Sequence, residues 1–83
     1  MYLNKITGTI TKERKENTIQ LLDAKENRFV FKTPVNDFKI ALEFSSMSSA
    51  YNSGFSYFFT HENIDIYAYQ LQNGEYLYAV CRN

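Results

Sequence analysis

The sequence predicts a small, β-rich α+β domain, and three observations carry that prediction. The chain has 83 residues, the size of one domain with a modest core, so we expect residues 1–83 to form a single unit. Apolar and polar side chains alternate along much of its length, which is typical of strands. An Asn-Gly pair at 73–74 separates two runs of aromatic and β-branched residues, the strongest short-range signal of a β-hairpin.

The first third of the chain predicts a three-stranded meander. Apolar residues alternate with lysine and threonine in the first run, and Gly8 within it is expected to mark a bulge, a bend or a close backbone approach. Charged and turn-forming residues separate the runs. The expected strands are 2–12, 18–23 and 28–32, with turns at 13–17 and 24–27.

The middle of the chain, residues 35–51, is open to two interpretations. Thr33-Pro34 is a typical helix start, and Gly54 is a typical residue after a helix end. A strand is the alternative, because apolar residues also occupy every second position from 38 to 44. We favour the helix, which would carry one apolar stripe for the sheet and a second for a partner or groove. The second stripe comprises Ile40, Phe44, Met47 and Tyr51.

The last third predicts a short strand at 55–60, a turn at 61–63 and a terminal hairpin. A type I′ turn at Asn73-Gly74 would have positive φ at both residues and would place Tyr69 opposite Tyr78. Side chains then alternate between two faces. One face would hold Ile64, Ile66, Ala68, Leu77, Ala79 and Cys81, and the other Tyr67, Tyr69, Leu71, Tyr76, Tyr78 and Val80.

The resulting order of elements is β-β-β-α-β-β-β. This order is expected of a small OB-like barrel. A plain antiparallel sheet with one helix packed on it is the competing architecture.

No motif in the sequence carries catalytic chemistry. His61 and Cys81 are the only residues of their kinds, so neither a metal ligand set nor a disulfide is predicted. We expect Cys81 to be a small core residue opposite Ile66, and His61 to lie in a turn. The carboxylates are scattered, and Asp65 is expected to pair with Arg82 across the hairpin. The sequence therefore predicts no enzyme, no cofactor and no metal.

Charge and composition narrow the class of partner. Nine basic and nine acidic residues give a net charge of zero, whereas nucleic-acid binders usually have a basic excess. The lone cysteine and the absence of a signal peptide or long apolar run predict a cytoplasmic protein. Phe, Tyr, Met, Ile, Asn and Lys far outnumber Gly, Ala, Arg and Pro, which indicates an AT-rich genome such as that of a phage or mobile element.

The tyrosines are the best functional candidates, because tyrosine offers contact area at low entropic cost. They could equally form a second core layer. We expect a non-enzymatic protein-binding module that self-associates, of the kind with which a phage or mobile element inhibits or regulates a host protein. One alternative is an OB-like single-stranded nucleic-acid binder, which stacks bases on the tyrosine-rich face and uses Lys5, Lys12 and Arg14 for phosphates. Another is a small-molecule pocket, lined by Phe and Tyr, inside a barrel. The predicted partner-binding residues are Tyr67, Tyr69, Tyr76, Tyr78, Phe44, Met47 and Tyr51.

Overall fold

The computed structural model describes residues 1–32 and 37–81, which form eight strands and one short helix. The expectation of a small, strand-rich α+β fold is confirmed, but the elements differ from the expected seven. They are β1 (Tyr2–Asn4), β2 (Ile10–Thr11), β3 (Thr18–Gln20), β4 (Ala24–Lys32), β5 (Asp37–Phe44), α1 (Met47–Asn52), β6 (Ser56–His61), β7 (Ile64–Gln70) and β8 (Tyr76–Cys81).

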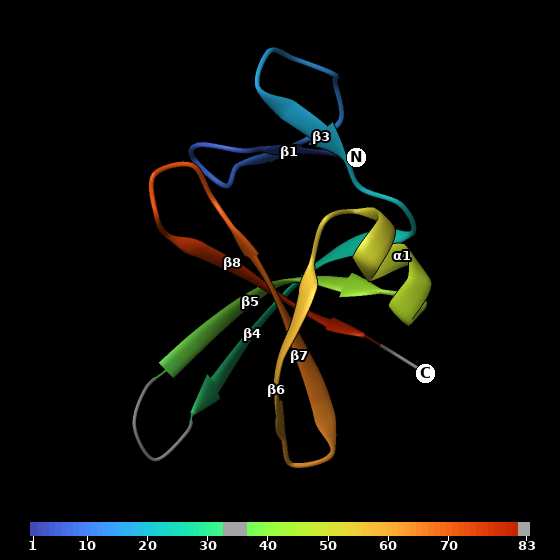
Figure 1. The fold of residues 1–83 in the computed structure, drawn as a ribbon, viewed down its shortest axis with the longest axis vertical. Coiled ribbons are helices and arrows are strands. Elements are labelled where there is room, and N and C mark those ends of the chain that lie inside the picture. Colours follow the sequence, from blue (N-terminus) through green and yellow to red (C-terminus); the bar gives the residue numbers. More distant parts are fainter. Residues whose placement is uncertain (33–36, 82–83) are drawn as a thin grey trace.

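The strands form two sheets. The smaller sheet has the order β2-β1-β3, and the larger has the order β4-β5-β8-β7-β6. Within the described residues, neighbouring strands run antiparallel except β5 and β8, which run parallel. A parallel pair needs a long crossover, here supplied by α1, β6 and β7. The small sheet lies at one end of the molecule, beside the β7–β8 loop and near α1 (Figure 1).

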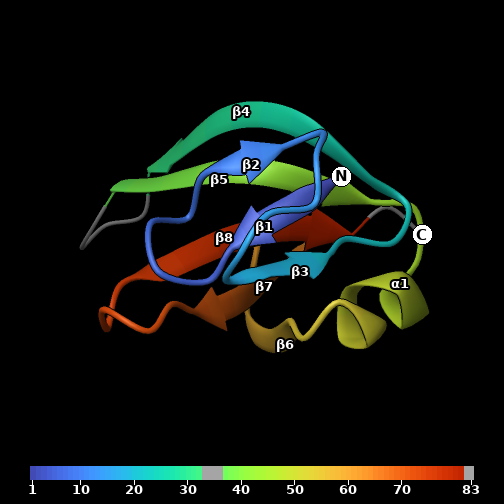
Figure 2. The same ribbon diagram turned by 90° about the horizontal axis from the view of Figure 1, so that it is seen from above.

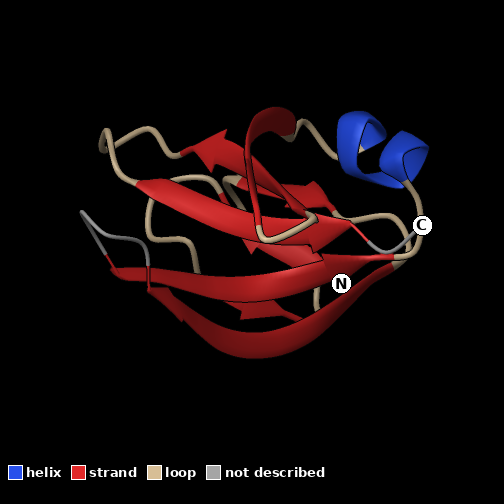
Figure 3. Ribbon diagram, turned by 90° about the horizontal axis from the view of Figure 1, so that it is seen from below, coloured by secondary structure: helices blue, strands red, loops and turns tan. Residues whose placement is uncertain are grey.

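The five-stranded sheet is curled but not closed. Its edges are β4 and β6, yet the rings of Phe31 in β4 and His61 in β6 lie 6.0 Å apart, edge to face. Register shifts interrupt both edge pairings, between Glu26 and Phe29 and between Tyr57 and Phe59. Such bulges increase the local bend and twist of a sheet. Figure 3 shows the strong twist that results.

The prediction of a helix through the middle segment was wrong for residues 37–44, which form β5. β5 lies between β4 and β8, and the β5–β8 pairing has a register shift between Ile40 and Leu42. Ile40 therefore packs in one core of the sheet, whereas Leu42 and Phe44 pack in the other. The helix start expected at Thr33-Pro34 and Val35, the first residue of the middle segment, lie outside the described residues. The true helix begins later, where the Ser46 hydroxyl accepts a hydrogen bond from the Ser49 N–H.

The N-terminal meander also differs from the prediction. The first expected strand is split into β1 and β2 by a turn, in which the Asn4 side chain accepts hydrogen bonds from the N–H groups of Ile6 and Thr7. Gly8 lies in that turn with a φ of +77°, not inside a strand. The turn expected at 24–27 is part of β4. The expected turn at 13–17 does connect two strands, β2 and β3.

The terminal hairpin is present, but its predicted turn and register were wrong. The Leu71 N–H donates to the Glu75 carbonyl (2.8 Å) and the Gly74 N–H to the Leu71 carbonyl (3.0 Å). Of this loop only Gly74 has a positive φ, +91°, so the loop has three residues rather than two. Tyr69 therefore faces Leu77 instead of Tyr78. A slip of one residue moves the side chains of one strand to the opposite face.

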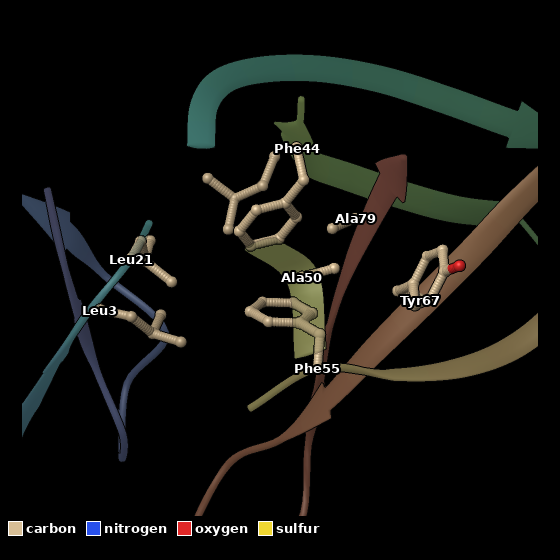
Figure 4. Packing of buried hydrophobic residues seen from close by; sticks show 8 residues of the cluster. Leu3, Leu21, Phe44, Ala50, Phe55, Tyr67 and Ala79 are labelled. Carbon is tan, nitrogen blue, oxygen red and sulfur yellow. The ribbon is translucent and has the colours of Figure 1, made fainter. Parts of the chain in front are cut away.

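The two faces of the large sheet carry separate cores. Figure 2 shows the small sheet in front of the large sheet and α1 to its side. The small sheet and α1 contribute residues to the core on one face, which we call the main-core face. Its buried residues come from both sheets and the helix: Leu3, Leu21, Leu42, Phe44, Ala50, Phe55, Tyr67 and Ala79 (Figure 4). The opposite face, which we call the trough, has a smaller core of Ile40, Ile66 and Val80, flanked by Phe31, Phe59 and Tyr78.

Candidate binding surface

The structure distributes the predicted tyrosines over both faces of the sheet. Tyr67 is 2% exposed within the main core, and Tyr69 packs against that core with its ring 5.5 Å from Phe55. Tyr76 and Tyr78 project from β8 on the trough side. The four rings that the sequence placed on one surface are therefore two pairs with different environments.

The residues predicted from the middle segment are also separated. Phe44 is completely buried, with its ring 5.1 Å from Phe55, so it belongs to the core. Met47 and Tyr51 of α1 are about half exposed. Tyr51 and Tyr57 both contact Tyr67 edge to face, at 5.7 and 6.1 Å. Tyr51 and Tyr57 are thus exposed rings at the margin of the main-core face, and Met47 is an exposed residue of α1.

The trough carries a compact cluster of three rings, which we call the aromatic triad: Phe58, Tyr76 and Tyr78. The ring centroid of Phe58 lies 6.3 Å from that of Tyr76 and 5.7 Å from that of Tyr78, and the centroids of the two tyrosine rings are 6.2 Å apart. The Phe58 and Tyr76 rings are nearly parallel, with an interplanar angle of 16°. Phe58 is 47% and Tyr76 48% exposed, so the triad presents two ring surfaces to solvent.

Phe58 joins the triad because of the bulge in β6. Regular pairing places Tyr57 opposite Tyr67 and Phe59 opposite Ile66, so the register shift makes Phe58 the extra residue between them. Tyr57 contacts Tyr67 on the main-core side, whereas Phe58 and Phe59 have their rings 5.3 Å apart on the trough side. A bulge in an edge strand re-aims a side chain in this way. The sequence reasoning missed Phe58, because the run Phe58-Phe59 gives no sign of which residue is extra.

Two grooves border Tyr76. The first, about 450 Å³, is open and mixed in character, and its walls are formed by Tyr57, Phe58, Tyr69 and Tyr76 with Gly54, Ser56, Ala68 and Gln70. The second, about 480 Å³, is more apolar and has two cationic residues in its lining. It is formed by Arg28, Val30, Lys39, Ile40, Ala41, Tyr76 and Leu77. Tyr76 is therefore the common wall of two concave sites beside the triad.

Two ionisable groups of β8 have raised pKa values. Burial, and then the neighbouring Tyr76, raise the pKa of the Tyr78 hydroxyl. Burial, followed by the charge of Asp65, raises the pKa of the Cys81 thiol, which opposes formation of the nucleophilic thiolate. Asp65 accepts a hydrogen bond from the Thr60 hydroxyl at 2.7 Å. Its expected partner, Arg82, lies outside the described residues.

Potential metal-ligating side chains are scattered over the part of the chain that the structure describes. Over residues 1–32 and 37–81, no group of three or more His, Cys, Asp or Glu side chains could hold a metal ion. Within these residues, the carboxylate near His61 is that of Glu62, whose Oε2 lies 3.9 Å from His61 Nε2. No described helix is long and apolar enough to cross a membrane.

The chain matches no protein-family model, no curated protein and no solved structure. Its function therefore has to be argued from its own surfaces.

Proposed function

We propose that this protein is a non-enzymatic protein-binding module whose principal contact surface is the aromatic triad. One observation carries the proposal: Phe58 and Tyr76 are about half exposed, yet their nearly parallel rings are held on β6 and β8, the two strands that flank β7, and lie beside two grooves. Aromatic residues on a rigid frame are enriched at the centres of protein interfaces, because they bury a large area and lose little entropy. The composition typical of an AT-rich genome favours a phage or mobile-element protein that inhibits or redirects a host protein.

The test uses two tyrosines of equal exposure on different faces. Tyr76, in the triad, and Tyr51, on α1, are each 48% exposed. Tagged wild type, Tyr76→Ser and Tyr51→Ser would be used to capture proteins from a lysate, with quantitative mass spectrometry as the readout. The proposal expects capture to be lost in Tyr76→Ser and kept in Tyr51→Ser. Equal capture by all three, or loss only in Tyr51→Ser, would contradict it.

A second candidate function is binding of single-stranded nucleic acid, and the lining of the second, more apolar groove beside Tyr76 favours it. Arg28 and Lys39 line that groove, so an aromatic ring and two cations lie together. The earlier assignment of Lys5, Lys12 and Arg14 as phosphate contacts has less support, because these residues belong to the small sheet and its loops. Fluorescence anisotropy with a labelled oligothymidine at low salt tests this candidate. No binding there, or binding insensitive to salt, would dispose of it.

A further inference from the structure

We propose that the edge strand β6 pairs antiparallel with β6 of a second copy of this chain, joining two five-stranded sheets. This inference goes beyond the proposed function, because it assigns a use to the backbone edge of the sheet rather than to the exposed rings of the triad. It names the contact through which the expected self-association would occur.

The two edges of the large sheet differ in their protection. β4, at one edge, carries Lys25, Glu26, Arg28 and Lys32. β6, at the other, is Ser-Tyr-Phe-Phe-Thr-His, with no carboxylate, lysine or arginine. Charged side chains, lysine above all, are the usual device that stops an exposed edge from pairing with another chain. β6 lacks that device although Tyr57 (51%) and Phe58 (47%) are both exposed on it.

A second copy fits this edge because a twofold axis brings a strand against itself. In the antiparallel arrangement centred on β6, Phe58 would lie opposite Phe59 of the second copy, and Tyr57 opposite its Thr60. Aromatic residues would face aromatic residues, and hydroxyls would face hydroxyls, as they already do within one chain, where the Tyr57 and Thr60 hydroxyls are 2.8 Å apart. Because the strand carries no lysine, arginine or carboxylate, no pair of such like charges opposes this pairing.

The geometry also limits how strong the dimer would be. β6 has six residues, and the bulge between Tyr57 and Phe59 interrupts its regular hydrogen-bonding pattern. A short, twisted edge offers few additional backbone hydrogen bonds and a small buried area. We therefore infer a reversible, concentration-dependent dimer rather than an obligate one.

Sedimentation equilibrium of three proteins tests the inference. Tyr57→Lys introduces a charge on β6, and its matched control Val30→Lys introduces the same charge on β4, where Val30 is 63% exposed. Wild type and Val30→Lys should rise from 9.8 kDa toward twice that mass with concentration. In Tyr57→Lys the dimer dissociation constant should increase at least about tenfold, because a charged lysine then lies in the paired edge, opposite Thr60 of the second copy. A wild type that is monomeric at every concentration, or a dimer weakened only by Val30→Lys, would overturn the inference.

Hydrogen exchange of the wild type provides a second test, which does not depend on whether Tyr57→Lys folds. Pairing through β6 should slow the exchange of those β6 amides that do not bond to β7, and should do so only at high protein concentration. Amides of β4 should be unchanged between the two concentrations. Concentration-dependent protection in β4 but not in β6 would refute the assignment of the edge. Tyr76→Ser should leave dimerisation intact, so failure of this inference is distinguishable from failure of the triad as a partner surface.

Discussion

The two tyrosine pairs of one hairpin have opposite environments. Tyr67 and Tyr69 of β7 belong to the main-core face, where Tyr67 is 2% exposed, whereas Tyr76 and Tyr78 of β8 lie in the trough, where Tyr76 is 48% exposed. Both pairs sit on strands with similar composition. The difference comes from the register of the β7–β8 pairing, which a single extra loop residue determines. Register, rather than residue type, decides which tyrosines support the fold and which are available to a partner.

The largest expected effect is the loss of stability when a tyrosine of the main-core face, rather than one of the trough, is replaced by alanine. Tyr67→Ala should reduce the free energy of unfolding by about 3–5 kcal/mol, as expected for a large buried aromatic residue. Phe44→Ala, at a fully buried position, should cost about as much. Tyr76→Ala should cost under about 1 kcal/mol, because the ring is half exposed. Urea denaturation measures all three. Similar losses for Tyr67→Ala and Tyr76→Ala would break the distinction between the pairs.

The sequence predicted the strands of the terminal hairpin but not the register in which they pair. The hairpin strands were predictable because aromatic and β-branched runs flank a turn-forming segment. Their register was not, since Asn73-Gly74 fits both a two-residue loop and the end of a three-residue loop. The two-residue loop occurs one hairpin earlier, where Glu62 and Asn63 have φ of 49° and 66°. That loop contains no glycine, so its sequence gave a weaker signal.

The candidate surface was predictable only in part for the same reason. Tyr76 and Tyr78 were identified from the alternating pattern of the predicted hairpin, but Phe58 depends on a bulge that forms through pairing with β7. A helix was favoured over the strand at 37–44 because the helix signals before this segment are local in the sequence. Burial of Leu42 and Phe44 in the strand depends instead on β4, β8 and the small sheet, which are distant in the sequence. Tertiary contacts override local propensity at such sites.

An intermediate effect is expected at the loop that sets the register. Gly74→Ala should destabilise the protein by about 1 kcal/mol, because its φ of +91° disfavours any side chain while the space around it is open. Asn73→Ala should cost less, since it removes only the hydrogen bond from the Glu75 N–H to the Asn73 side chain (2.9 Å). Thermal unfolding compares the two. A larger loss for Asn73→Ala would point to a positive φ at Asn73 and to the other register.

The smallest effect expected is in the pH dependence of stability. Burial raises the pKa values of Tyr67 and Tyr78 above the ordinary 10.0, so the folded state favours their neutral forms. The resulting stabilisation is fully present below pH 10.0 and is lost as the pH rises through the folded-state pKa values. Denaturation at increasing alkaline pH, with Tyr67→Phe/Tyr78→Phe as control, measures it. A loss of stability unchanged in the double variant would assign it to other groups.

The most direct test of the account is the register of β7 against β8 in solution, measured by nuclear Overhauser effects between Hα protons. In antiparallel sheets these protons approach closely across pairs that do not exchange hydrogen bonds. With the Leu71–Glu75 hydrogen bond closing the loop, such contacts should join Gln70 to Tyr76 and Ala68 to Tyr78. A strong contact between Tyr69 and Tyr78 would instead place both tyrosines on one face. That result would contradict the division of the tyrosines between core and binding surface.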